Sequence, residues 1–443
     1  MADTTPGATA PHGRDHAAPP PGAPRLTGFK ALELDTRLLG MIGAFVLICL
    51  AFHLASDGRF VTPRNLFNLT IQTASVAIMA TGMVFVIVTR HIDLSVGSVL
   101  ATCSAVMAMA QTAWLPGLGI DIGSPMIAPL AIAAGLVAGI VIGGFHGWLV
   151  GYLGIPAFIV TLGGLLVWRN VAWYLTNGQT IGPLDGAFMQ LGGIRGTLGE
   201  TGSWILGLVA VAGAFWALWS ARRAKIAHDF PVKPFWAEGA VAAAIAAVIL
   251  GFVALVNAYE VPSRVLARDY AARGLEMPEG LIQGYGVPFS VILVLLVALV
   301  MTVVARRTRF GRYVFATGGN PDAAELSGID TRWLTVKIFA LLGALCAVSA
   351  VVASARLANH SNDIGTLDEL RVIAAAVIGG TALKGGIGTI HGAIIGALIM
   401  QSLQSGMAMV GVDAPLQNMV VGTVLVVAVL IDILYRRRMG ARD

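Results

Sequence analysis

Long, uninterrupted apolar runs separated by short polar stretches dominate the chain from residue 38 onward. A run of about 20 apolar residues makes a helix that crosses the hydrocarbon core of a bilayer. The runs lack the polar–apolar alternation of membrane β-barrels, and only helices and closed barrels satisfy their backbone hydrogen bonds in lipid. The pattern therefore predicts an all-α polytopic membrane protein with about 12 transmembrane helices (10–12). The predicted spans are 38–56, 65–88, 93–113, 126–150, 156–177, 203–221, 236–257, 288–305, 332–354, 369–383, 387–410 and 415–434.

The pair 369–383 and 387–410 is the least regular part of this pattern. Its first member is short, and the two are joined by the glycine-rich string KGGIG. Two full spans and a partly re-entrant pair both remain open.

Composition agrees with a membrane location. Of 443 residues, 56% are hydrophobic and only 12% are charged, whereas soluble domains carry roughly 25% charged residues. The net charge of +5 comes from basic residues near the ends of spans, where they set orientation, so nucleic acid is not expected as a partner. The three cysteines lie in apolar segments without CxxC spacing, and no His/Cys/Asp cluster has metal-ligand spacing.

The chain divides into three parts. Residues 1–35 are rich in proline, alanine and glycine and are expected to form a disordered tail. Residues 36–435 form the transmembrane domain, and 436–443 are a basic tail. With twelve spans, the basic clusters at 222–233, 306–332 and 436–438 fall on the same side as the N-terminus, which predicts that both termini are cytoplasmic.

One loop on the basic side contains a short helix with strong end signals, about 318–330. Asn320 suits the N-cap and Pro321 the first helical position, and Gly328 suits the C-terminal stop. A solvated connector and a docking element for a cytoplasmic partner are both compatible with this pattern. The docking interpretation involves Gly319, Asn320, Pro321, Asp322, Ala323, Ala324, Glu325, Leu326 and Gly328.

A second polar stretch, HIDLSVGS at 91–98, separates two apolar runs. The predicted topology places it at a membrane face, in the turn between the second and third spans. Asp93 or Ser95 is expected to cap the third span, and Gly97 to allow close packing.

The chain resembles the sugar permeases of ATP-binding-cassette (ABC) importers. GGNPDAAELSGI is similar to the cytoplasmic coupling loop of that family, and HIDLSVGSVLA to its early motif. The fifth span and the glycine-rich pair VIGGTALKGGIGTIHGAIIGALI resemble the family in the same order, so the likeness covers most of residues 60–435. The extra middle segment, about 203–287, resembles the D-xylose branch, with the ribose, arabinose and galactose branches as alternatives.

The resemblance implies a division of labour. Two copies of the chain line a path for a monosaccharide in the bacterial inner membrane, surrounded by lipid. A separate cytoplasmic ATPase binds ATP, and a periplasmic sugar-binding protein delivers the sugar. Inverted repeats are implied for 65–177 and 332–434. In agreement, the sequence has no GxxxxGK[ST] motif, so no cofactor of its own is expected.

Few polar residues within the spans offer contacts to a sugar. The fifth span contains Trp168, Arg169, Asn170 and Asn177, and other spans contain Gln72 and Gln401. An intramembrane arginine indicates a functional site, but Arg169 could instead cap the carbonyls of a broken helix. The glutamines could simply bond across helices.

Two other classes of function fit the sequence less well. An ion-coupled secondary transporter would need acidic residues near the bilayer midplane, whereas those of this chain are predicted near span ends. An intramembrane enzyme would need paired carboxylates, a zinc motif or a Ser/His pair within the spans, and none is predicted.

Overall fold

The computed structural model describes residues 36–438 except 229, 231 and 273. Within these residues helices form all the regular structure, and strand pairing is limited to isolated bridges. The predicted tail 1–35 lies outside the described residues, and α16 extends to Arg438, into the predicted basic tail. The elements are α1 (Thr36–Ala55), α2 (Pro63–Val88), α3 (Val96–Met109) with the π turn η2 (Ala110–Trp114) and the 3₁₀ turn η3 (Pro116–Leu118), α4 (Ile127–Gly151), α5 (Ala157–Thr176), α6 (Gly186–Gln190), α7 (Gly199–Ala227), α8 (Phe235–Asn257), α9 (Ser263–Ala272), α10 (Phe289–Arg307), α11 (Arg309–Gly319), α12 (Pro321–Leu326), α13 (Thr331–Leu357), α14 (Asp368–Ile378), α15 (Ile390–Met409) and α16 (Ala414–Arg438).

Ten helices in the described part of the chain are long and apolar enough to cross a membrane. They correspond to ten of the predicted spans, and α16 contributes a shorter apolar stretch, Ala414–Leu430. The predicted span 369–383 is wrong as a full crossing, because α14 has only 11 residues. At 1.5 Å per residue such a helix covers about 16 Å, roughly half of the hydrocarbon core.

Helices α2 and α13 form the centre of the bundle. In their apolar stretches 89% and 78% of the residues are buried, against 6% in α7 and none in α1. Side chains from α2, α3, α4, α13, α14 and α15 contribute to one continuous hydrophobic core. The outer helices α1, α7 and α8 leave large apolar side chains exposed, as expected for surfaces that face lipid.

Glycines bring α4 and α13 into close antiparallel contact. A Cβ on Gly139 would collide with the carbonyl oxygen of Gly343, and a Cβ on Gly143 with that of Phe339. Gly147 lies in the same way against Val336. Because these glycines are four residues apart, they lie on one face of α4. Their lack of side chains lets the backbones of α4 and α13 approach closely.

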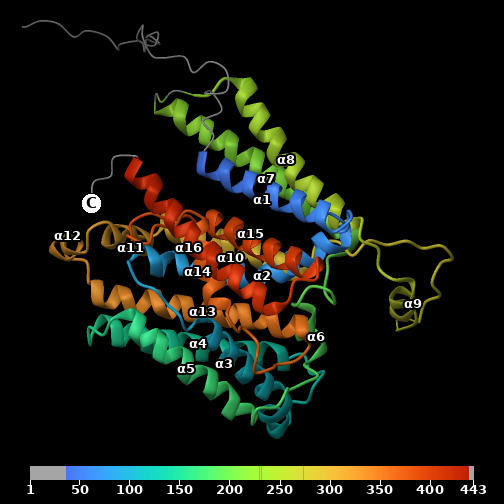
Figure 1. The fold of residues 1–443 in the computed structure, drawn as a ribbon. Coiled ribbons are helices and arrows are strands. Elements are labelled where there is room, and N and C mark those ends of the chain that lie inside the picture. The colour runs from blue at the N-terminus through green and yellow to red at the C-terminus, as the bar shows by residue number, and fades with distance from the viewer. Residues whose placement is uncertain (1–35, 229, 231, 273, 439–443) are drawn as a thin grey trace, which may run out of the picture.

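The segment predicted as an extra middle region forms a peripheral hairpin of α7 and α8 and a long connection containing α9. Figure 1 shows this connection extending away from the bundle on the side opposite α12. At its base the rings of Phe67, Tyr259 and Tyr285 pack together, with ring centroids 4.9–5.3 Å apart. The two ends of the bundle are called below the α9 side and the α12 side.

Two non-helical connectors enter the interior of the bundle. Connector 1 (89–95) joins α2 to α3, and connector 2 (358–367) joins α13 to α14. They meet where α3 begins, because a Cβ on Gly97 would collide with the carbonyl oxygen of Gly365 and would lie 2.6 Å from Glu369 Oε2. The close packing expected at Gly97 is therefore present, in the interior of the bundle.

Candidate functional site

A polar cavity of about 480 Å³ opens beside connector 2. Its walls come from α2, the end of α13, connector 2, the start of α14 and α15. Such a volume lies within the range of small-molecule sites. The lining residues are Gln72, Ser75, Val76, Ala353, Arg356, Leu357, Ser361, Asp363, Ile364, Gly365, Thr366, Asp368, Arg371, Gln401 and Gln404.

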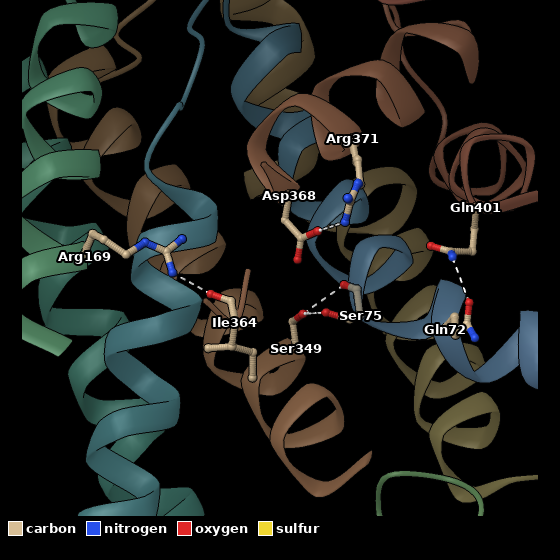
Figure 2. Close-up of polar contacts among 8 residues, drawn as sticks. All are labelled: Gln72, Ser75, Arg169, Ser349, Ile364, Asp368, Arg371 and Gln401. Atoms are coloured by element: carbon tan, nitrogen blue, oxygen red, sulfur yellow. Dashed lines mark hydrogen bonds and ion pairs between the residues drawn. The ribbon is translucent and has the colours of Figure 1, made fainter. Parts of the chain in front are cut away.

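Hydrogen bonds hold the polar walls of this cavity in place (Figure 2). Gln401 Nε2 donates to Gln72 Oε1 at 3.0 Å and so links α15 to α2. Arg371 Nη1 lies 2.9 Å from Asp368 Oδ1 in the first turn of α14. These pairs satisfy one another and still have further donors and acceptors, so the cavity can offer hydrogen bonds to a polar solute.

Of the predicted path residues, only Gln72 and Gln401 line the cavity. Trp168 Nε1 instead donates to His146 Nε2 at 2.8 Å. Asn170 donates to Leu166 within its own helix, and Asn177 forms the left-handed C-cap of α5. Both asparagines are exposed, so the polar groups of α5 do not form one sugar-facing row.

Arg169 lies behind the cavity wall. Its Nη1 donates to the carbonyl oxygens of Asn362 at 2.9 Å and Ile364 at 2.6 Å, the second of which is drawn in Figure 2. Of the two roles left open by the sequence, the geometry matches the capping of carbonyls at a broken helix. The carbonyls belong to connector 2, which itself lines the cavity.

Two polar residues of the HIDLSVGS stretch are buried inside the bundle. Asp93 and Ser95 are 4% and 0% exposed. Ser95 is the N-cap of α3 but makes no side-chain cap bond. Asp93 Oδ1 instead accepts from the Ser95 N–H at 2.7 Å and from the Ser95 hydroxyl at 2.6 Å, so it braces connector 1 and does not cap the helix.

This turn also belongs to a buried hydrogen-bonded chain that contains a Ser/His pair, which the sequence did not predict. His146 Nδ1 lies 3.3 Å from Ser95 Oγ. Because the Trp168 indole N–H can only donate, His146 Nε2 must accept and a neutral ring carries its proton on Nδ1. The proton order therefore runs from Trp168 to His146, to Ser95 and to Asp93. Ser95 donates its own proton to Asp93 and not to His146, which is the reverse of an activated nucleophile.

The predicted loop helix is present as α12, on the opposite side of the bundle from α9 (Figure 1). Asn320 Oδ1 accepts from the Ala323 N–H at 3.0 Å, and Pro321 is the first helical residue. Gly328 has a φ of +83° just beyond the end of the helix, where a left-handed residue favours glycine. Leu326 is 90% exposed, so α12 presents an apolar side chain on a rigid, capped turn.

Sequence reasoning missed the charged residues at the cavity, above all Arg356 and Arg371. Arg371 lies within the predicted span 369–383, where an arginine is costly unless it has a function or a partner, and Arg356 lies two residues beyond the predicted span 332–354. The rule that drew attention to Arg169 therefore also applied to Arg371, whereas the predicted boundary left Arg356 outside its span. Asp368 was noted only as a residue near a span end, whereas the structure buries it in the first turn of α14.

Comparison with known proteins identifies the family. Residues 65–429 match the family model described as "Branched-chain amino acid transport system / permease component". The chain belongs to this permease family. It is thus a transport permease and not an enzyme, as the sequence predicted.

Curated members of the family cover nearly the whole chain. The xylose transport system permease protein XylH of Haemophilus influenzae is 36% identical over 93% of this chain and 100% of its own. XylH of Escherichia coli is also 36% identical, over 94% and 96% of the two chains. The ribose import permease protein RbsC of Escherichia coli is 31% identical over 88% and 92%. No solved structure matches the chain.

Proposed function

We propose that the chain is the transmembrane permease subunit of an ABC-type sugar importer and that its sugar is D-xylose. The observation that carries the proposal is the polar cavity beside connector 2, because it gathers hydrogen-bonding side chains from several helices around one space. The choice of D-xylose rests on XylH, which is similar over almost the full length. Ribose is the alternative that RbsC supports.

The proposed orientation puts the α12 side in the cytoplasm of a bacterial inner membrane. Arg306 and Arg307 end α10 on that side, directly before α11 and α12, as positive residues favour the cytoplasmic face. Both termini then lie in the cytoplasm, and α9 lies on the periplasmic side. A cytoplasmic ATPase binds ATP and receives α12, while a periplasmic sugar-binding protein docks on the α9 side.

Two copies of the chain form the path in this proposal, with Gln72 and Gln401 among the residues that meet the sugar. The two connectors support an inverted repeat, because each follows a long central helix and each ends at a helix that begins inside the bundle. Trp168 and Arg169 act from behind the cavity, on the connectors. Asn170 and Asn177 do not line the cavity, and their place in the path stays a prediction.

Reconstituted vesicles test the proposal directly. Vesicles containing this chain and its ATPase are given labelled D-xylose, the binding protein and internal ATP. We expect the labelled D-xylose to accumulate only when all three proteins are present. Unlabelled D-xylose should reduce this accumulation more than unlabelled D-ribose does. Replacement of 319–328 by a flexible linker of equal length is expected to abolish accumulation and ATPase binding. If the ATPase remains bound and active when the linker replaces these residues, the proposed role of α12 in binding the ATPase is wrong.

One observation favours a second candidate, a secondary transporter driven by ions. Asp93, Asp368 and Glu369 are all less than 10% exposed, although the sequence placed them near span ends, and buried carboxylates mark proton paths in transporters. Against this, Asp93 accepts two hydrogen bonds from Ser95 and Asp368 pairs with Arg371. Uptake by the chain alone under a pH gradient, without the ATPase, would favour the second candidate.

A further inference from the structure

Connector 2 has two sides with different surroundings. One side lines the polar cavity through Ser361, Asp363 and Thr366, of which Asp363 and Thr366 are exposed. The connector contains no helix or strand, and both Ala358 and Leu367 have positive φ angles of 61° and 62°. Left-handed residues other than glycine are uncommon and persist only where surrounding contacts hold them, so contacts from outside the connector must set its shape.

Those contacts come from the side away from the cavity, and Arg169 makes the strongest of them. One nitrogen, Nη1, donates to two carbonyl oxygens of the connector, at 2.9 Å and 2.6 Å. Hydrogen bonds from an ionised donor are roughly twice as strong as neutral ones. Because the carbonyls of Asn362 and Ile364 are two residues apart, this one side chain determines the course of the segment between them.

Weaker bonds hold the same connector from neighbouring elements. The Thr176 hydroxyl, which bonds to the Ala172 carbonyl oxygen of its own helix at 3.0 Å, also lies 3.3 Å from Asn362 Oδ1. The backbone of His360 pairs with that of Ile181, at 2.9 Å and 3.0 Å. His360 Nδ1 lies 3.0 Å from Ser104 Oγ on α3. The connector is thus bound from α3, α5 and the segment after α5, and Arg169 supplies the only charged side chain in α5.

The position of the charge also matches the acidic groups around it. Asp363, Asp368 and Glu369 all interact electrostatically with Arg169. Asp363 and Asp368 line the cavity, whereas Arg169 does not. The arginine therefore acts on the cavity from outside it, through the backbone it binds and through the carboxylates it faces.

From this geometry we infer that Arg169 is a positioning residue for the sugar path: it holds connector 2 so that residues 361–366 present their polar groups to the passing sugar. The inference rests on the proposed function. It assigns Arg169 a role in coupling sugar movement to ATP hydrolysis, without any contact between Arg169 and the sugar.

The readout is the number of D-xylose molecules transported per ATP hydrolysed, in vesicles that contain the full complex. Loss of folded complexes lowers both rates equally and leaves this ratio unchanged, whereas a displaced connector lowers sugar transport alone. Arg169→Met, which keeps the length and removes the donors, is expected to lower the ratio about tenfold, the change that one lost charge-assisted hydrogen bond gives. Arg169→Lys keeps the charge and is expected to lower it about threefold.

Two further variants serve as controls. Arg195→Met is the matched control, because Arg195 is exposed and its side chain contacts Met189 and not the connector; its ratio should equal that of the wild type. Asn362→Ala removes only the weaker Thr176 contact and leaves both carbonyls bound by Arg169 in place, so its ratio should fall by less than that of Arg169→Lys.

An unchanged ratio in Arg169→Met overturns the inference, as does an unchanged ratio in Arg169→Lys where Arg169→Met cannot be assembled. Failure of the proposed function is a different result: the wild-type complex itself then accumulates no D-xylose, whatever residue stands at position 169.

Discussion

Two neighbouring glycines on α4 offer a sharp test of the packing against α13. Gly143 faces α13: an added Cβ would collide with the carbonyl oxygen of Phe339 and lie 2.9 Å from its carbonyl carbon and 3.1 Å from Ala340 Cα. Gly144 is one position on, and its added Cβ would meet only Ala340 Cβ, at 3.9 Å. The two substitutions to alanine add the same atom to the same helix in different surroundings.

The magnitude follows from what must move. The contacts of Gly143 are with backbone, which cannot rotate away, so α4 and α13 must separate by about 1 Å. A gap of that size forfeits a quarter to a half of each dispersion contact it opens, and overpacking of this kind costs about 1–3 kcal/mol. Alanine in place of glycine in a helix regains about 0.5–1 kcal/mol. Gly143→Ala is therefore expected to be destabilised and Gly144→Ala to be neutral or slightly stabilised.

The measurement is the midpoint of thermal unfolding of each purified variant in the same detergent. The signal is the fraction of protein that remains monodisperse after heating. A difference of about 1–3 kcal/mol between the variants corresponds to a midpoint about 1–3 °C lower for Gly143→Ala in a chain of this size. If Gly143→Ala unfolds at or above the temperature of Gly144→Ala, the close contact of α4 and α13 does not exist as described.

Two further predictions concern the signature turn and α12. Asp93→Asn keeps an acceptor for both bonds from Ser95 and should retain much of the uptake, whereas Asp93→Leu leaves two buried donors unpaired, at about 1–3 kcal/mol each, and should lower the amount of folded chain in the membrane; equal amounts in the two variants would contradict the bracing role. Asn320→Ala removes the cap of α12, at about 1 kcal/mol, and should lower the ATPase that co-purifies several-fold, while Asn320→Asp, which also caps, should restore it.

The sequence predicted the long helices well because hydrophobic length alone defines a membrane span. Where α2, α13 and the other full crossings lie, the runs of 19–29 residues in the structure match the predicted segments. The error at 369–383 has a simple cause: an 11-residue helix followed by an apolar turn has the same composition as a short span. Amino-acid composition does not show at which residue a helix ends.

The burial of Asp93 is a feature that the sequence did not indicate. A short polar stretch between two apolar runs looks the same whether its side chains face water or pack inside the bundle. The distinction depends on partners that are distant in sequence, such as His146, 51 residues from Ser95. Likewise, the two roles of Arg169 could be separated only once Asn362 and Ile364 were seen beside it, 193 and 195 residues further along.

The two connectors are both held by α5, but with different strength. The Thr161 hydroxyl lies 3.3 Å from the carbonyl oxygen of Ile92 in connector 1 and bonds at 2.9 Å within its own helix, so connector 1 receives at most a shared neutral bond. Connector 2 receives two bonds from a guanidinium. Of the two connectors, only connector 2 lines the cavity. The charged contact from Arg169 therefore holds the connector whose displacement would change the site. A lysine or a neutral donor at position 169 would still fill the space, which is why the ratio of sugar to ATP, and not stability, separates the positioning role from simple packing.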